Sequence, residues 1–196
     1  MILLVAIAVS IAVAFLRGGR LGGLTALSVR WGALAVAAFA IQAFFIYQTP
    51  ARTTAGAWGW QEFLFVSSYL LLLAVIWVNR HLPGIKLVGL GLLLNFIVIV
   101  ANGGWMPVTP EALTKVGYAY LAPSLASGTR VRNTKDIILS KQETRLWFLS
   151  DIFILSRPFP VPSVCSIGDI VIASGAFLLI QSAMLGDKGQ TLLQRN

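Results

Sequence analysis

The stretch LVGLGLLLNFIVIVA fills residues 87–101, and NGGWMPV follows it directly at residues 102–108. The first part carries no charged residue, which is typical of a helix surrounded by lipid. Its 15 residues rise about 22 Å, so flanking aromatic and basic side chains must complete a span of the ~30 Å hydrocarbon core. Two adjacent glycines and Pro107 then end the helix, because glycine adopts left-handed backbone and proline keeps the helix from resuming.

Four further apolar blocks lie along the chain, at residues 2–16, 31–48, 63–78 and 170–185. Of the 196 residues, 57% are hydrophobic and 11% are charged, whereas a soluble domain carries about 25% charged residues. We therefore expect an all-α integral membrane protein, with a single domain over residues 1–196 and about five transmembrane helices. A long external segment, residues 102–168, separates the fourth helix from the fifth.

Small residues recur at every fourth position of the first block, at Ala6, Ser10, Ala14 and Gly18. Such a stripe lets a second helix approach closely. The alternative is chance in an alanine-rich segment, and we favour packing.

Basic residues flank the apolar blocks unevenly and thereby indicate an orientation. The short connection 49–61 carries only Arg52, whereas the connections on the other side carry Arg17, Arg20, Arg30, Arg80, Lys86, Lys188 and Arg195. Because basic short loops stay in the cytoplasm, we expect the N-terminus outside and the C-terminus cytoplasmic, in a cell inner membrane or plasma membrane. The formal charge of +8 then reflects topology, and we do not expect nucleic-acid binding.

The segment 102–168 contains several local patterns. Residues 109–113, TPEAL, are typical of a helix start, with a hydroxyl cap, proline in the first turn and an acid at the positive dipole end. Residues 127–141 are polar and basic and favour an exposed loop or hairpin. Residues 145–155 are apolar but too few to span, so we expect an interfacial or re-entrant helix. Alternate prolines make residues 157–162 a stiff extended linker, and the whole segment is expected to cover the outer mouth of the bundle.

Two counts restrict the chemistry. Cys165 is the single cysteine and His81 the single histidine, which excludes an internal disulfide, a thiolate metal cage and bis-histidine haem ligation within this chain. No nucleotide-binding, zinc-protease or serine-hydrolase motif occurs. We therefore predict no catalytic residue and no metal ligand, and the sequence indicates no particular cofactor.

Two amides lie in apolar surroundings. Asn95 and Asn102 are seven residues apart, on the same helix face as Gly91, and polar groups in lipid should point into the bundle. Asn95 either joins two helices or contacts a ligand. Asn102 either caps a tightly turned helix exit or belongs to a cavity floor in which Gly103 and Gly104 expose backbone amides.

Two acids also interrupt apolar runs. Asp151 lies within WFLSDI (147–152) and Asp169 within SIGDI (166–170), and an ionisable group in such a place is a functional-site hypothesis. Asp169 either caps the fifth helix or serves function, and Asp151 is open in the same way. Arg145 and Arg157 are candidate partners, and the two acids could also form an acid–base pair.

Five stretches together resemble an uncharacterised bacterial family of small multi-pass membrane proteins, a domain of unknown function. They are RGGRL (17–21), NRHLPG (79–84), NGGWMPV (102–108), LWFLSD (146–151) and SIGD (166–169). The resemblance extends over nearly the whole chain and implies a multi-pass prokaryotic membrane protein, with attention to Asn102, Asp151 and Asp169. Ser150 stands where glycine is expected in that pattern, which leaves the backbone geometry before Asp151 open. The resemblance implies no activity.

Two functional hypotheses remain. The first is a non-enzymatic accessory or assembly subunit that binds a protein partner and membrane lipids within a larger complex, since the helices are slim and no catalytic motif is present. The second is a transporter or enzyme that handles a lipid, quinone or small solute at an outer-leaflet pocket. Asn95, Asn102, Asp151 and Asp169 are the candidate ligand-binding residues. Of the two hypotheses, the accessory subunit is the leading one and the ligand-handling protein is the alternative.

Overall fold

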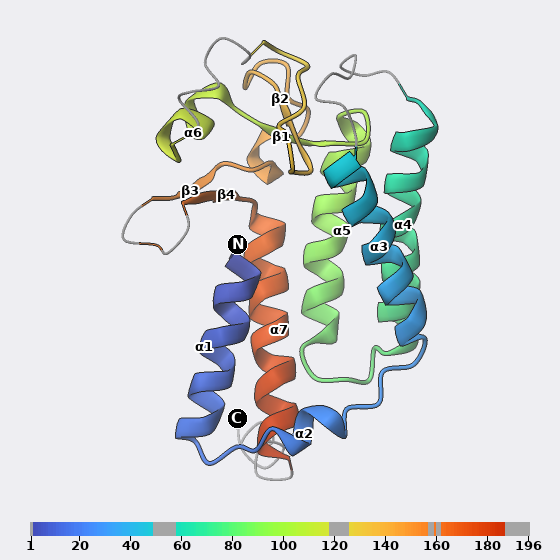
Figure 1. The fold of residues 1–196 in the computed structure, drawn as a ribbon, viewed down its shortest axis with the longest axis vertical. Helices are drawn as coiled ribbons and strands as arrows, with labels where there is room; N and C mark the ends of the chain where they lie inside the picture. Colours follow the sequence, from blue (N-terminus) through green and yellow to red (C-terminus); the bar gives the residue numbers. More distant parts are fainter. Residues whose placement is uncertain (1, 49–57, 118–125, 157–158, 160–161, 187–196) are drawn as a thin grey trace.

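The computed structural model describes residues 2–48, 58–117, 126–156, 159 and 162–186, and most of these are helical (Figure 1). The main helices are α1 (Ile2–Leu16), α3 (Gly32–Gln48), α4 (Trp60–Val78), α5 (Ile85–Ala101) and α7 (Ile167–Leu185), and α2 (Gly22–Thr25) is a single turn. A helix thus lies in each of the five apolar blocks. In the described part of the chain, α4 and α7, with 19 residues each, are long and apolar enough to cross a membrane, and α1, α3 and α5 are shorter.

Contacts connect the five long helices in the order α1, α7, α5, α4, α3, which leaves α1 and α3 at the two ends of the row. In Figure 1, α3 is seen between α5 and α4. Helices α1, α4 and α7 run away from the end that carries the strands, and α3 and α5 run toward it. The fifth apolar block therefore lies between the first and the fourth, although it comes last in the sequence. This insertion brings the start of α7 beside the end of α5.

Glycines on both helices let α5 and α7 approach closely. A Cβ atom at Gly91 would meet the Gly168 carbonyl oxygen, and one at Gly175 would lie 2.6 Å from the Val88 nitrogen. Gly84 faces Gly175 in the same way, one turn further along. Backbone contact of this kind is typical of membrane helices, which gain stability from tight packing and interhelical hydrogen bonds.

Polar groups fix α1 to α7. The Ser10 hydroxyl donates to the Phe177 carbonyl (3.0 Å), and the Gln181 amide donates back to the Ser10 carbonyl (2.6 Å). Arg17 donates to the Gln181 side-chain oxygen (2.9 Å). Ser10 and Ala14, two members of the small-residue stripe, are fully buried. These contacts occupy the buried polar groups, as a low-dielectric environment requires.

A small cap covers one end of the bundle. It contains α6 (Pro110–Lys115), a 3-10 turn (Trp147–Leu149) and two two-stranded sheets: β1 (Met106–Val108) parallel to β2 (Asp136–Ile138), and β3 (Phe153–Leu155) antiparallel to β4 (Ser163–Cys165). The Thr109 hydroxyl accepts the Ala112 N–H (3.2 Å), so the predicted helix start at 109–113 is confirmed. The prediction of an all-α fold is wrong for the cap, where sheet pairing satisfies the backbone of short segments.

Three of the predicted segments, residues 127–141, 145–155 and 157–162, belong to the cap. The expected helix at 145–155 is wrong, because Leu146 adopts a positive φ of 55° and the segment ends in β3. Residues 127–141 do contain a hairpin-like bridge between Arg130 and Ile137, but Val131 and residues 137–139 are buried rather than exposed. Most of the predicted linker 157–162 lies outside the described residues.

Trp105 joins the cap to the bundle. It is 1% exposed, stacks on Phe65 of α4, and donates its indole N–H to Glu62 (3.1 Å). The Arg130 guanidinium lies 3.4 Å above the other face of its ring. Burial lowers the pKa of Arg130 to about 10, an effect that the Glu62 carboxylate opposes, so the group stays charged at neutral pH. Gly104, with φ 93°, leaves the room that Glu62 occupies.

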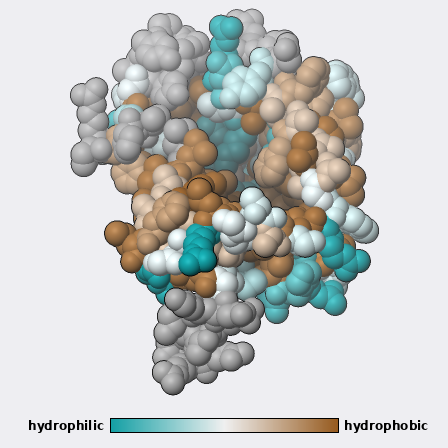
Figure 2. All heavy atoms as spheres, turned by 60° about the horizontal axis from the view of Figure 1, so that its bottom comes forward, coloured by the Kyte–Doolittle hydropathy of each residue, from teal (hydrophilic) through white to brown (hydrophobic). Residues whose placement is uncertain are grey.

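Apolar side chains cover the sides of the helices. Figure 2 shows hydrophobic side chains along the bundle and hydrophilic ones gathered at the end that the view brings forward. On α3, which lies at the edge of the row, Val36, Phe39 and Tyr47 are between 58% and 69% exposed. Exposed aromatic and aliphatic side chains of this extent are expected where lipid, rather than water, surrounds a helix.

The glycine contact predicts a stability loss from a single methyl group. Gly175→Ala should lower the free energy of unfolding by about 1–3 kcal/mol, because the new Cβ overlaps backbone of α5. Gly32→Ala is the matched control, since a Cβ there has nothing within 4 Å. Unfolding in detergent, followed by circular dichroism, measures both. Equal stability of the two variants would contradict the close approach.

Candidate functional site

The first turn of α7 carries a capping box. Ser166 is the N-cap: its hydroxyl accepts the Asp169 N–H (3.0 Å), and Asp169 accepts the Ser166 N–H in return (3.3 Å). Two backbone N–H groups that a helix leaves unpaired are thereby satisfied. The Asp169 side chain is thus fixed at the end of the bundle that faces the cap, with its charge at the positive end of the helix dipole.

Asn95 of α5 completes this turn from the neighbouring helix. Its amide donates to Asp169 (2.7 Å), and its oxygen accepts the Ser166 hydroxyl (2.7 Å). A Cβ at Gly168 would collide with the Asn95 oxygen, so the glycine makes this contact possible. Both polar ends of Asn95 are occupied by α7, which favours its interpretation as a link between helices.

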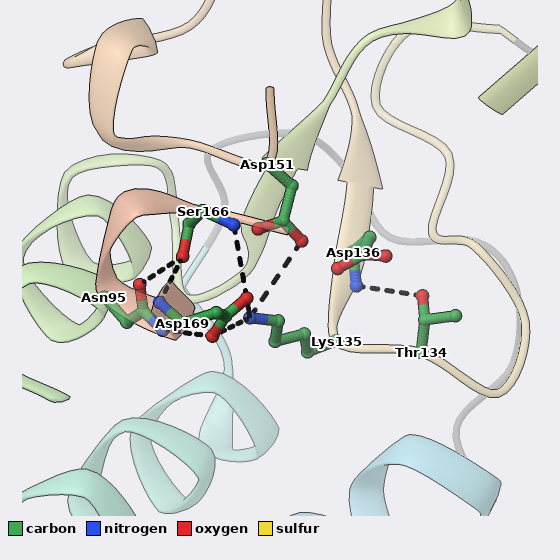
Figure 3. A network of polar contacts seen from close by, with 7 residues as sticks. All are labelled: Asn95, Thr134, Lys135, Asp136, Asp151, Ser166 and Asp169. Carbon is green, nitrogen blue, oxygen red and sulfur yellow. Dashed lines mark hydrogen bonds and ion pairs between the residues drawn. The ribbon is translucent and has the colours of Figure 1, made fainter. Parts of the chain in front are cut away.

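A lysine from the cap lies between two of the acids (Figure 3). The Lys135 ammonium is 3.4 Å from Asp169 and 3.9 Å from Asp151, whose side chain is only 2% exposed. Burial alone would lower the pKa of Lys135, but the Asp151 and Asp169 carboxylates outweigh this effect and raise the pKa well above its ordinary value of 10.5. Lys135 therefore stays charged.

Strand β1 places these groups. The Met106 N–H donates to the Lys135 carbonyl (3.0 Å), next to the parallel pairing of β1 with β2. The Asp151 N–H donates to the Pro107 carbonyl (3.2 Å), within a bridge between Val108 and Asp151. One short strand thus holds Lys135 and Asp151, which are distant in sequence. The glycine-rich exit from α5 is what turns the chain into this strand.

The cluster lines a cavity of about 490 Å³ between the cap and the ends of α1 and α7. Polar walls come from Lys135, Asp136, Asp151, Ser163 and Asp169, and apolar walls from residues such as Ile2, Leu113, Val131 and Ile172. A volume in this range is that of a small-molecule pocket.

Three polar atoms of this cavity are buried without a hydrogen-bond donor or acceptor among the described residues: Asp136 Oδ1, Asp151 Oδ1 and Ser163 Oγ. Buried polar atoms are rarely left unpaired, because each lost hydrogen bond costs about 1–3 kcal/mol. The Asp136 and Asp151 side chains are neighbours in the cavity wall, and each affects the pKa of the other. Burial, the largest cause, raises the pKa of both carboxyls above 3.8, and that of Asp151 well above it.

Cys165 also lines the cavity but is poorly suited to nucleophilic chemistry. Burial raises the pKa of its thiol to about 11, and the Asp169 carboxylate acts in the same direction. The reactive thiolate is therefore scarce at neutral pH. Within the described ranges, no group of three or more His, Cys, Asp and Glu side chains has an arrangement that could hold a metal ion.

The structure brings together three of the four predicted site residues: Asn95, Asp151 and Asp169. Asn102 lies elsewhere. Its amide donates to the Val98 carbonyl (2.8 Å) and the Arg145 carbonyl (2.9 Å), and its oxygen accepts the Arg145 N–H (2.9 Å). Asn102 therefore ends α5 and fixes the backbone of a cap loop.

The predicted partners of the acids differ from the observed one. Lys135, rather than Arg145, pairs with both Asp151 and Asp169, and Arg157 lies outside the described residues. Lys135, Asp136 and Ser163 were not predicted as site residues. The only local signal is a Lys-Asp pair directly before the apolar run 137–139, which could have indicated a short buried strand.

Comparison with known proteins identifies a family. The family of unknown function DUF5317 matches residues 26–181. The chain belongs to this family. An uncharacterized protein of Thermotoga maritima is similar to the DUF5317 chain, with 44% identity over 55 residues, which are 28% of this chain and 32% of that protein. The match thus spans about a third of the relative. No solved structure matches the chain.

The raised pKa of Asp151 predicts that the stability of this DUF5317 chain depends on pH. Because folding raises the pKa of Asp151 above its unfolded value of 3.8, the folded state binds the proton more tightly. This tighter binding stabilises the folded state fully below about pH 4. The stabilisation declines as pH rises, by up to about 1.4 kcal/mol per pH unit. Asp151→Asn should remove much of this decline between about pH 4 and pH 8.

Unfolding of both proteins in detergent across that range measures the effect. Glu111→Gln is the control, since Glu111 is exposed on α6 and should keep the wild-type dependence. If wild type and Asp151→Asn change with pH in parallel, folding does not raise the pKa of Asp151.

Proposed function

We propose that this chain crosses the membrane five times and that its outer-end cavity binds a small ligand. The ligand class is a lipid, quinone or small solute, which the protein carries or converts at the outer leaflet. Helices α1, α3 and α5 have 15 to 17 residues and would complete their spans with flanking Trp, Tyr and Arg side chains.

The distribution of charge supports an orientation with the N-terminus outside and the C-terminus cytoplasmic. Arg17, Arg20, Arg30, Arg80 and Lys86 lie at the end of the bundle opposite the cap. Among the described residues, all acidic side chains lie at the cap end: Glu62, Glu111, Asp136, Glu143, Asp151 and Asp169. Retention of short basic loops in the cytoplasm then puts the cap outside.

One observation carries the ligand-binding proposal. Three buried polar atoms, on Asp136, Asp151 and Ser163, have no hydrogen-bond partner in the part of the chain that the structure describes, and they line one cavity of about 490 Å³ beside a charged lysine. A purely structural ion-pair network would use its acceptors internally, as Asn95 and Ser166 do. A ligand with hydrogen-bond donors would satisfy them instead.

An accessory subunit is the second candidate. It is favoured by α3, which lies at the edge of the row and exposes Val36, Phe39 and Tyr47. Lipid alone would also cover this face, so the proposal of a protein partner needs a direct test. The two functions are compatible, because the face of α3 and the cavity belong to different parts of the molecule.

The orientation can be tested with single cysteines in a Cys165→Ser background. In intact cells, a membrane-impermeant maleimide should label Lys141→Cys in the cap and should label Arg20→Cys only after the cells are permeabilised. Both positions are exposed, so accessibility to water does not separate them. Labelling of both, or of Arg20→Cys alone, in intact cells would contradict the proposed orientation.

The two functions can be separated by gentle solubilisation from native membranes, followed by mass spectrometry of intact complexes. We expect a small molecule bound to the wild-type chain and reduced about tenfold or more in Asp151→Asn, since a charge-assisted hydrogen bond contributes about 1.5–3 kcal/mol. Glu111→Gln should retain it. A wild-type chain without any bound small molecule, but with a stoichiometric protein partner, would leave only the accessory function.

A further inference from the structure

Two hollows meet at the start of α1. The polar cavity includes Ile2 and Leu3 in its lining. An apolar groove of about 500 Å³ lies between α1 and α7 and also includes Ile2. On α7, Asp169 lines the cavity and the next residue, Ile170, lines the groove. The polar cavity therefore continues into an apolar groove on the side of the bundle.

The groove follows both helices over about two turns. Its walls run from Ile2 to Val9 on α1 and from Ile170 to Leu178 on α7, a length of roughly 12 Å at ~1.5 Å per residue. Val9, Ile170 and Leu178 are each exposed by more than a third, so the groove is open along its length. Its lining is almost entirely hydrocarbon, apart from Ser174, whose hydroxyl donates to its own helix at Ile170. The groove suits an alkyl chain.

The charges around the cavity indicate which head group a ligand with such an alkyl chain would carry. Lys135 faces three carboxyl groups, so the cluster has an excess of negative charge that an anionic head would increase. The three atoms to which the described residues offer no partner, Asp136 Oδ1, Asp151 Oδ1 and Ser163 Oγ, are all able to accept hydrogen bonds. A primary ammonium has three N–H donors and a positive charge, and so matches these acceptors in number and the cluster in charge.

We propose that the ligand is an amphiphile with a primary ammonium head, seated among Asp136, Asp151 and Ser163, and an alkyl chain in the groove between α1 and α7. This inference rests on the proposed ligand-binding function and names its substrate class. The ammonium donates to the oxygens of these three side chains, and its positive charge offsets part of the negative charge of the carboxyl groups.

Photo-crosslinking tests the proposal on the full chain in phosphatidylcholine nanodiscs. Three probes share one alkyl chain with a diazirine at its middle and differ in the head: primary amine, alcohol or carboxylate. Peptide mass spectrometry locates the adducts. We expect the amine to label the α1 and α7 peptides that contain Val9 and Leu178, at least about tenfold more than the other two probes.

Two variants separate the head from the chain. Asp151→Asn should reduce amine labelling roughly tenfold, because a charged acceptor is lost. Ala6→Phe, which fills the groove without touching the acids, should reduce it to a similar extent, and it serves as the test if Asp151→Asn does not fold. Val36→Phe on the outer face of α3 is the control and should label as wild type.

The outcomes distinguish this inference from the function on which it rests. Amine labelling of the groove that both variants reduce supports the proposal. Preferential labelling by the alcohol or carboxylate probe, reduced in Asp151→Asn, overturns the ammonium head but leaves ligand binding at the cavity. Amine labelling that Ala6→Phe does not change overturns the alkyl groove. If no probe gives labelling that depends on Asp151 or Ala6, the amphiphile proposal is overturned. The proposed ligand-binding function fails only if the native chain also carries no bound small molecule.

Discussion

A side chain larger than hydrogen at Gly91, Gly168 or Gly175 would meet atoms of the facing helix, and the close contact of α5 with α7 exists only because all three are glycine. This contact brings Asn95 within 2.7 Å of both Ser166 and Asp169. Asn95 then holds the first turn of α7 from the side, while the capping box holds it from within. The position of the Asp169 carboxylate, and with it one wall of the cavity, follows from how tightly two helices pack.

The exit from α5 contributes the other wall. Gly103 and Gly104 adopt φ values of 77° and 93°, which redirect the chain into β1. Strand β1 offers hydrogen bonds on both edges, so β2 attaches on one side and Asp151 on the other. Three residues of strand are thus enough to bring Lys135 next to Asp151 and above Asp169. The packing of Trp105 between Phe65 and Arg130 holds this arrangement onto α4.

Composition and local pattern are sufficient for the helices, because an apolar block of 15 to 19 residues depends little on its neighbours. Asp151 and Asp169 can be singled out for the same reason, since a charge within an apolar run is costly anywhere. Lys135 could not be found in this way. It lies in a polar run, and its role depends on a parallel strand pairing across about 30 residues, which leaves no local periodicity.

The segment 145–155 illustrates the opposite error. Its apolar composition is typical of an interfacial helix, yet the backbone at Leu146 and the hydrogen bond from the Asp151 N–H to Pro107 favour a turn and an extended strand. Pairing with segments distant in sequence therefore determines the structure of residues 145–155, and their apolar composition does not. The same limit applies to Asn102, which sequence spacing grouped with Asn95 and which the chain uses to fix the Arg145 backbone instead.

Charge balance is the constraint that gives the cavity its chemical character. Three carboxyl groups and one ammonium in a place of low dielectric cannot all be ionised without an unpaired charge, which buried sites avoid by taking up a proton or a counter-ion. The ion pair between Lys135 and Asp169 neutralises one carboxylate. Lys135 lies farther from Asp151, so the negative charge of Asp136 and Asp151 is only partly compensated. Burial therefore favours the uptake of a second positive charge, either a proton or a cationic group, near Asp136 and Asp151. The cavity and the apolar groove between α1 and α7 share Ile2, so the proposed ammonium amphiphile would reach the acids along an apolar surface.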